Sequence, residues 1–96
     1  MNTITKVSDI TYLDVGDYIR VDGEQNTLET LLNVAKEYIK SYTGLDDTEI
    51  DEHADFVIAV LILCQDMYDN RTMYVDKDNV NKVVDTILGM HSVNLL

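Results

Sequence analysis

The sequence predicts an all-α fold: a small helical domain of about four helices, one short, two long and antiparallel, and one C-terminal. Three observations support this prediction. Apolar residues recur at the i, i+3, i+4 spacing of an amphipathic helix over most of the chain. The chain contains no proline, so nothing in it forces a long helix to break. Its 96 residues suffice for one hydrophobic core, so residues 1–96 are expected to form a single domain.

The N-terminal segment is expected to contain an extended arm followed by a short helix. Residues 1–10 alternate weakly between apolar and polar side chains, as an extended arm would. Thr11, with Asp14 three residues later, resembles a capping box at the start of a helix. The helix that follows is predicted to run from Tyr12 to about Arg20.

The next helix has the clearest periodicity in the chain. Asn26, with Glu29 three residues later, predicts its start after a turn at residues 22–25. Gly44 is expected to end it in the left-handed conformation that many helices use to terminate. Its apolar side is formed by Leu28, Leu31, Leu32, Ala35, Tyr38, Ile39 and Tyr42.

An acidic segment precedes the second long helix. Its six acids in ten positions are Asp46, Asp47, Glu49, Asp51, Glu52 and Asp55. Acids are favoured in a first helical turn by the helix dipole, and Thr48 is the predicted cap. The helix continues to Tyr68, and this length favours a helix over a strand for its apolar stretch. Phe56, Val60 and Leu63 widen the apolar stripe beyond what a surface helix needs, so we expect the helix to be central or to face a neighbouring subunit as well.

The C-terminal helix follows a polar, irregular segment at residues 71–79. Asn79 is its predicted cap, and Gly89 is expected to fray or end it. Its apolar side is formed by Val80, Val83, Val84, Ile87 and Leu88.

The charge balance limits the classes of partner. Eighteen acids against seven bases give a net charge of -11, which argues against a grip on nucleic acid or on an anionic membrane surface. It permits three uses: solubility alone, a cationic partner, or a surface that repels DNA. The longest apolar run, residues 56–64, is far shorter than the roughly 20 residues of a spanning helix. With no apolar signal region and one cysteine, an intracellular protein is expected.

No combination of residues predicts catalysis, a metal or a cofactor. Glu49 and His53 share a helix face, but two ligands are too few for a closed zinc site and His91 is remote in sequence. Cys64 lies in an apolar run, where burial is more natural than a reactive thiolate. No glycine-rich phosphate loop occurs. We therefore expect neither an enzyme nor a bound cofactor.

The six tyrosines and the arginine after the second long helix have two interpretations. Tyr38, Tyr42 and Tyr68 lie on apolar stripes, where their rings either pack in the core or contribute to an interface. Arg71 either satisfies the last carbonyl groups of the helix or contacts a partner.

Three short motifs, in order, resemble those of phage head–tail connector proteins, the small DNA-packaging adaptors encoded beside portal and capsid genes. Residues 17–22 (Asp-Tyr-Ile-Arg-Val-Asp) resemble the "eYLRID" ending of that family's first helix. Ala35, Tyr38, Ile39, Thr43 and Gly44 stand at the spacing of its "AxxYIxxxTG" motif. Tyr68, Asn70 and Arg71 match its "YxNR" element. The similarity covers about residues 12–71.

The resemblance implies a structural subunit of the virion neck, present in the host cytoplasm during assembly. The expected assembly is a cyclic homo-oligomer, dodecameric in the virion, that docks under the portal protein and extends the DNA channel. It would also join a tail-joining or stopper protein, with DNA only as passing cargo and no membrane. The predicted interface residues are Tyr18, Arg20, Tyr68, Asn70, Arg71, Phe56, Val60 and Leu63. The predicted DNA-repelling surface is formed by Asp46, Asp47, Glu49, Asp51, Glu52 and Asp55.

A second hypothesis fits the same charge without a ring. An acidic helical binding module, such as a DNA-mimic inhibitor of a DNA-handling protein, would also be small, helical and strongly negative. It would remain monomeric or dimeric and would bind a basic partner in a salt-sensitive way.

Overall fold

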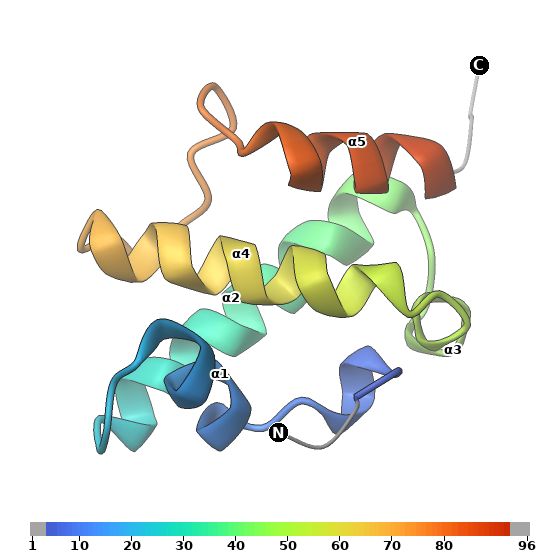
Figure 1. The fold of residues 1–96 in the computed structure, drawn as a ribbon. Coiled ribbons are helices and arrows are strands. Elements are labelled where there is room, and N and C mark those ends of the chain that lie inside the picture. The colour runs from blue at the N-terminus through green and yellow to red at the C-terminus, as the bar shows by residue number, and fades with distance from the viewer. Residues whose placement is uncertain (1–3, 93–96) are drawn as a thin grey trace.

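The computed structural model describes residues 4–92, and over that range it confirms the predicted all-α class. The described chain contains five α-helices and one short 3₁₀ helix, without a strand. In chain order the elements are η1 (Val7–Asp9), α1 (Tyr12–Ile19), α2 (Gln25–Thr43), α3 (Asp47–Asp51), α4 (Asp55–Asp69) and α5 (Lys82–His91). The long helices α2 and α4 run in roughly opposite directions (Figure 1), as the sequence predicted.

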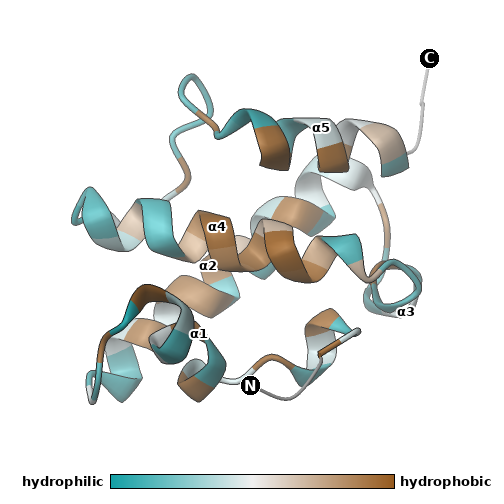
Figure 2. Cartoon of the chain, viewed as in Figure 1, coloured by the Kyte–Doolittle hydropathy of each residue, from teal (hydrophilic) through white to brown (hydrophobic). Residues whose placement is uncertain are grey.

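Helix α4 is the centre of the molecule. It contacts α2, α5, α1 and η1, with α5 on one side and the N-terminal elements on the other (Figure 1). Its ribbon carries the most apolar stretch of the fold (Figure 2). The core cluster formed around it includes residues from every helix of the described chain, with Ile50 as the contribution of α3. No helix within residues 4–92 has the length and apolarity required to cross a membrane.

The apolar stripe of α4 is wide because the helix is enclosed by its own chain. Phe56 and Val60 are 0% exposed and Leu63 is 2% exposed. The prediction that these three side chains also face a neighbouring subunit is therefore corrected, since the subunit's own core covers them. The exposed apolar residue of α4 is Ile58, at 53%.

The start of α1 agrees with the prediction, and its glycine has a packing role. Thr11 and Asp14 form the expected capping box, with the Thr11 backbone N–H donating to Asp14 Oδ2 at 2.8 Å. Gly16 is buried where the chain turns back from α1 toward α2. A Cβ at this position would lie 2.7 Å from the carbonyl oxygen of Val21, so the close approach requires glycine.

Helix α2 begins two residues earlier than predicted and ends as predicted. Glu24, not Asn26, precedes its first turn, with a left-handed backbone at φ 51°. Its expected apolar side is buried at Leu28, Leu31, Leu32, Ala35 and Ile39, whereas Tyr38 is half-buried and Tyr42 is exposed. Gly44 ends the helix in the left-handed region at φ 74°.

The acidic segment forms a separate short helix, contrary to the prediction of one continuous helix. Asp46, not Thr48, caps α3: its carboxylate accepts from the Glu49 backbone N–H at 2.8 Å. The Glu49 carboxylate accepts in return from the Asp46 N–H at 3.1 Å. This reciprocal box fixes the start of α3, and α4 then begins anew at Asp55 after a bend.

Both ends of the described chain differ from the sequence expectation. The predicted arm is not fully extended, because it contains η1 and buries Val7 and Ile10. At the other end Asn81, not Asn79, caps α5, accepting from the Val83 N–H at 2.8 Å. Asn79 instead donates its side-chain amide to Asp76 at 2.8 Å, which leaves the cap to the later asparagine. Gly89 lies within α5 rather than ending it.

Candidate functional site

Helices α1 and α4 both end on an arginine in the left-handed conformation. Arg20 follows α1 with φ 63°, and Arg71 follows the α4 cap with φ 58°. These are the only two arginines in the chain. Within residues 4–92 only one other non-glycine residue has positive φ, and this is Glu24 in the same α1–α2 turn.

The hydrogen bonds at these two ends explain the backbone conformation. After α4, the Thr72 N–H donates to the Met67 carbonyl at 2.9 Å and the Arg71 N–H donates to the Tyr68 carbonyl at 3.2 Å. This is a Schellman ending, in which glycine normally takes the position that Arg71 occupies. After α1, the Val21 N–H donates to the Gly16 carbonyl at 2.9 Å in the same way. A side chain in the left-handed region costs about 1 kcal/mol relative to glycine, so both arginines are held at an energetic cost.

A tyrosine connects the two helix ends. The Tyr68 hydroxyl, in the last turn of α4, donates to Glu24 Oε2 at 2.8 Å. This hydrogen bond raises the pKa of the Tyr68 hydroxyl above its usual value. The Arg71 guanidinium carbon lies 5.8 Å from the centre of the Tyr68 ring, within the range of a cation–π contact. We call residues 18–24 and 68–71 the arginine corner; both segments lie at the same end of the molecule (Figure 1).

The arginine corner contains five of the predicted interface residues. Arg20, Asn70 and Arg71 are exposed, and Tyr18 is 39% exposed. Tyr68 is half-buried between Glu24 and Arg71. Among the described residues, ion pairs involve Lys40 and His91 and neither arginine. No carboxylate of the described residues therefore pairs with either guanidinium group.

The predicted acidic surface lies at the other end of α4, around α3 (Figure 1). Asp46 and Glu49 cap α3, as described above, and Glu52 is exposed. Asp47 pairs with Lys40 at 3.5 Å, and Asp51 accepts from the Ser8 hydroxyl at 2.7 Å. The six acids are thus a solvated cluster in which most members also have a structural partner.

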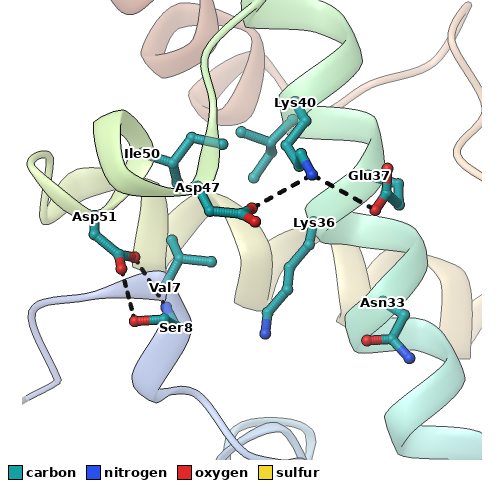
Figure 3. Close-up of a pocket in the computed structure, with 10 residues that line it drawn as sticks. Val7, Ser8, Asn33, Lys36, Glu37, Lys40, Asp47, Ile50 and Asp51 are labelled. Atoms are coloured by element: carbon teal, nitrogen blue, oxygen red, sulfur yellow. Dashed lines mark hydrogen bonds and ion pairs between the residues drawn. The ribbon is translucent and has the colours of Figure 1, made fainter.

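A hollow of about 330 Å³ lies beside this acidic cluster, between η1, α2 and α3 (Figure 3). Lys36 and Lys40 enter it from α2, and Asp47 and Asp51 from α3. The Ser8 hydrogen bond lowers the pKa of the Asp51 carboxyl. Because carboxylates accompany the two ammonium groups, the hollow has mixed charge rather than the single sign that attracts an anion.

The buried cysteine agrees with its prediction. Cys64 is 0% exposed in the core, and burial raises the pKa of its thiol to about 12. A thiol that stays protonated at neutral pH is a poor nucleophile.

One cluster of potential metal ligands was not predicted from the sequence. His91 is remote from His53 in sequence, yet the structure places it beside His53 and Asp55, with potential ligand atoms of all three within 4.8 Å of one another. The packing of the end of α5 on the start of α4 produces this contact, and periodicity alone does not contain that information.

Comparisons of this chain with protein-family models, with curated proteins and with solved structures gave no match in any of the three. The resemblance to head–tail connectors therefore rests on the motifs quoted above.

Proposed function

We propose that this protein is a head–tail connector subunit, which assembles as a ring under a phage portal, extends the DNA channel and offers a platform to a tail-joining or stopper protein. Its ring would be a closed cyclic homo-oligomer, in which one surface of each subunit contacts a different surface of the next. The proposal has no catalytic component.

The observation that carries the proposal is the arginine corner. Arg20 and Arg71 occupy positions that favour glycine for stability, and both side chains are exposed and form no ion pair with any residue in the range 4–92. Strained backbone of this kind is concentrated at functional sites. Arginine and tyrosine are also the residues most enriched among interface hot spots. The corner therefore has the composition and the geometry of a contact surface.

The arginine corner contains two of the three motifs that resemble those of head–tail connectors. Arg20 lies in the "eYLRID"-like segment, and Tyr68, Asn70 and Arg71 form the "YxNR"-like segment. Arg20 and Tyr68 are 48 residues apart in the sequence. The hydrogen bond between Tyr68 and Glu24 nevertheless brings the two segments into contact. A shared role at one interface accounts for both motifs.

The acidic surface around α3 has a role in the same proposal. Phosphates that pass through a channel would adhere to a basic wall, whereas a negative wall lets them slide. The net charge of -11 and the exposed carboxylates of residues 46–55 suit such a wall. Placement of these acids on the outer wall of an assembled ring would contradict this part.

The test is to measure assembly mass and to image the purified protein by negative stain, with and without its portal protein. Rings, free or on the portal, are expected for the wild type. Arg20→Ala and Arg71→Ala should reduce ring formation, whereas Lys77→Ala, an exposed cation outside the corner, should not. A monodisperse monomer that never joins a portal would overturn the proposal.

The charge favours one other function. A net charge of -11 on a small helical domain also suits a DNA-mimic module that inhibits a basic DNA-handling protein. That protein would form no ring and would bind its partner with an affinity that falls steeply with salt.

A further inference from the structure

Three side chains with metal-binding chemistry converge where the end of α5 meets the start of α4. His91 is the last residue of α5, Asp55 is the first residue of α4, and His53 lies in the bend just before α4. All three are half-buried, and one potential ligand atom from each lies within 4.8 Å of the others. His53 and His91 are the only histidines in the chain.

The contacts within this cluster are specific. His91 Nε2 lies 2.8 Å from Asp55 Oδ2. The His53 and His91 rings stack with centroids 4.0 Å apart and planes 28° from parallel. The Phe56 ring lies against both, with centroids 5.6 Å from His53 and 5.0 Å from His91. An apolar wall therefore covers one side of a group of two imidazoles and a carboxylate.

We propose that His53, Asp55 and His91 bind one divalent transition-metal ion, such as Zn²⁺, with water in the fourth position. Two imidazole nitrogens and one carboxylate oxygen form a donor set that suits Zn²⁺, Co²⁺ or Ni²⁺. Mg²⁺ and Ca²⁺ prefer oxygen ligands and would bind poorly.

The required rearrangement is small. Ligands at the usual zinc distances in a tetrahedral site are about 3.3 Å apart. His91 Nε2 and Asp55 Oδ2, now 2.8 Å apart, would open slightly as the ion replaces the proton between them. The third ligand, from His53, needs a side-chain adjustment of at most about 1.5 Å from the present 4.8 Å limit.

The surroundings favour a cation. The net charge of -11 raises the local concentration of positive ions around the molecule. Because the ligands come from the start of α4 and the end of α5, the ion would bind only the folded chain and would hold α5 against the core. This site is independent of ring assembly.

The first test uses the wild-type protein, tag-free and stripped with a chelator, so that it depends on no variant. NMR spectra of the two histidine rings should show that both shift on titration with Zn²⁺ and that neither shifts with Mg²⁺. Calorimetry should give one ion per chain, and Co²⁺ should produce visible absorption typical of a site with nitrogen ligands. The melting temperature should rise by roughly 5–10 °C at an ion concentration ten times the Kd.

The second test uses variants whose folding is checked by circular dichroism. His53→Asn and His91→Asn should each weaken Zn²⁺ binding by more than about tenfold. Glu52→Gln removes an exposed acid beside the site and should change the affinity by less than about twofold, because an exposed charge is screened by solvent. Unshifted histidine signals in the wild type, or Zn²⁺ binding as tight as that of the wild type in either histidine variant, would overturn the proposal and leave His91–Asp55 as a structural contact alone.

Discussion

The Tyr68 hydroxyl donates a 2.8 Å hydrogen bond to the Glu24 carboxylate and thereby joins the last turn of α4 to the residue before α2. Glu24 has a left-handed backbone, and Tyr68 also lies under the guanidinium group of Arg71. One side chain thus links the end of the central helix to the strained turn between α1 and α2. This hydrogen bond is the contact that connects the two segments of the arginine corner.

Tyr68→Phe should lower the melting temperature by only about 1–3 °C, because the hydroxyl is solvent-accessible and water replaces its partner. The pKa of Tyr68 is raised in the folded chain, so its contribution is present below the ordinary tyrosine pKa of 10.0 and is lost as the pH rises through the folded value. The difference between variant and wild type should therefore be largest at pH 7, shrink above about pH 10 and vanish only above the raised pKa of the folded chain. Thermal melts at pH 7 and pH 10.5 measure it.

Tyr18→Phe is the matched control for this experiment, since the Tyr18 hydroxyl has no hydrogen bond to the rest of residues 4–92. Its melting temperature should equal that of the wild type at both pH values. An equal loss in both variants would contradict a role for the Tyr68–Glu24 bond.

Ser8→Ala should loosen the N-terminal segment from α3. The Ser8 hydroxyl and N–H both donate to Asp51, at 2.7 and 3.0 Å, and the bond lowers the pKa of the Asp51 carboxyl. That contribution is present above the usual carboxyl pKa of 3.8 and is lost as the pH falls through the lower folded value. The loss should be about 0.5 kcal/mol at pH 7, because the pair is solvent-screened, and should shrink below pH 4. Denaturant unfolding of Ser8→Ala against Thr5→Ala, an exposed hydroxyl on the same segment, checks it.

Periodicity predicted the helices well because each is buried on one side by the rest of the chain. The predicted leucine, isoleucine and alanine positions of α2 are buried, and Thr11–Asp14 and Gly44 mark real helix ends. The break between α3 and α4 was missed because acids suit the start of either a short or a long helix. Its signal was present in the sequence: Asp46 with Glu49 three residues later is a better capping box than Thr48 alone.

The candidate sites were less predictable, for two physical reasons. Glycine is the usual sign of a left-handed helix end, so Arg20 and Arg71 gave no indication of their backbone conformation. The cluster of His53, Asp55 and His91 depends on how α5 packs against α4, which no local pattern encodes. Phe56 shows a related limit of sequence patterns. A wide apolar stripe predicts that its residues are buried, but it does not say whether the same subunit or a neighbouring one buries them.

Cys64 should react very slowly with thiol reagents in the native protein. It is 0% exposed, so a reagent cannot reach the sulfur atom. Burial also raises the pKa of its thiol to about 12, so the reactive thiolate is scarce at pH 7. In denaturant, the thiol should be labelled within the ordinary reaction time of a free cysteine. Labelling by iodoacetamide, followed by mass spectrometry, measures the ratio of the two rates. Fast native labelling would mean that α4 opens readily from the core.

Gly16→Ala and Gly89→Ala should have opposite effects although both glycines lie within helices. A Cβ at Gly16 would lie 2.7 Å from the Val21 carbonyl oxygen, so the substitution should destabilise the fold by about 1–3 kcal/mol. A Cβ at Gly89 would meet nothing within 4 Å, so alanine should stabilise α5 by about 0.5–1 kcal/mol. Denaturant unfolding of the two variants compares them directly, and changes of the same sign would contradict the packing described for the α1–α2 turn.

Arg71→Gly should separate the stability of the subunit from its assembly. Glycine relieves the left-handed strain at φ 58°, and part of this gain is offset by the lost contact with the Tyr68 ring. The net result should be an increase of about 0.5 kcal/mol in the free energy of unfolding. Ring formation, measured by particle mass and negative stain, should nevertheless decrease, because the guanidinium group is absent.

Arg71→Ala completes the comparison, since alanine keeps the strain and loses the same guanidinium group. It should assemble as poorly as Arg71→Gly while being less stable than that variant. An arginine whose backbone strain lowers the stability of the subunit is expected only where its side chain makes a contact that the function requires. Wild-type ring formation by Arg71→Gly would therefore remove the arginine corner from the proposed interface, and a less stable Arg71→Gly would contradict the strain on which the argument depends.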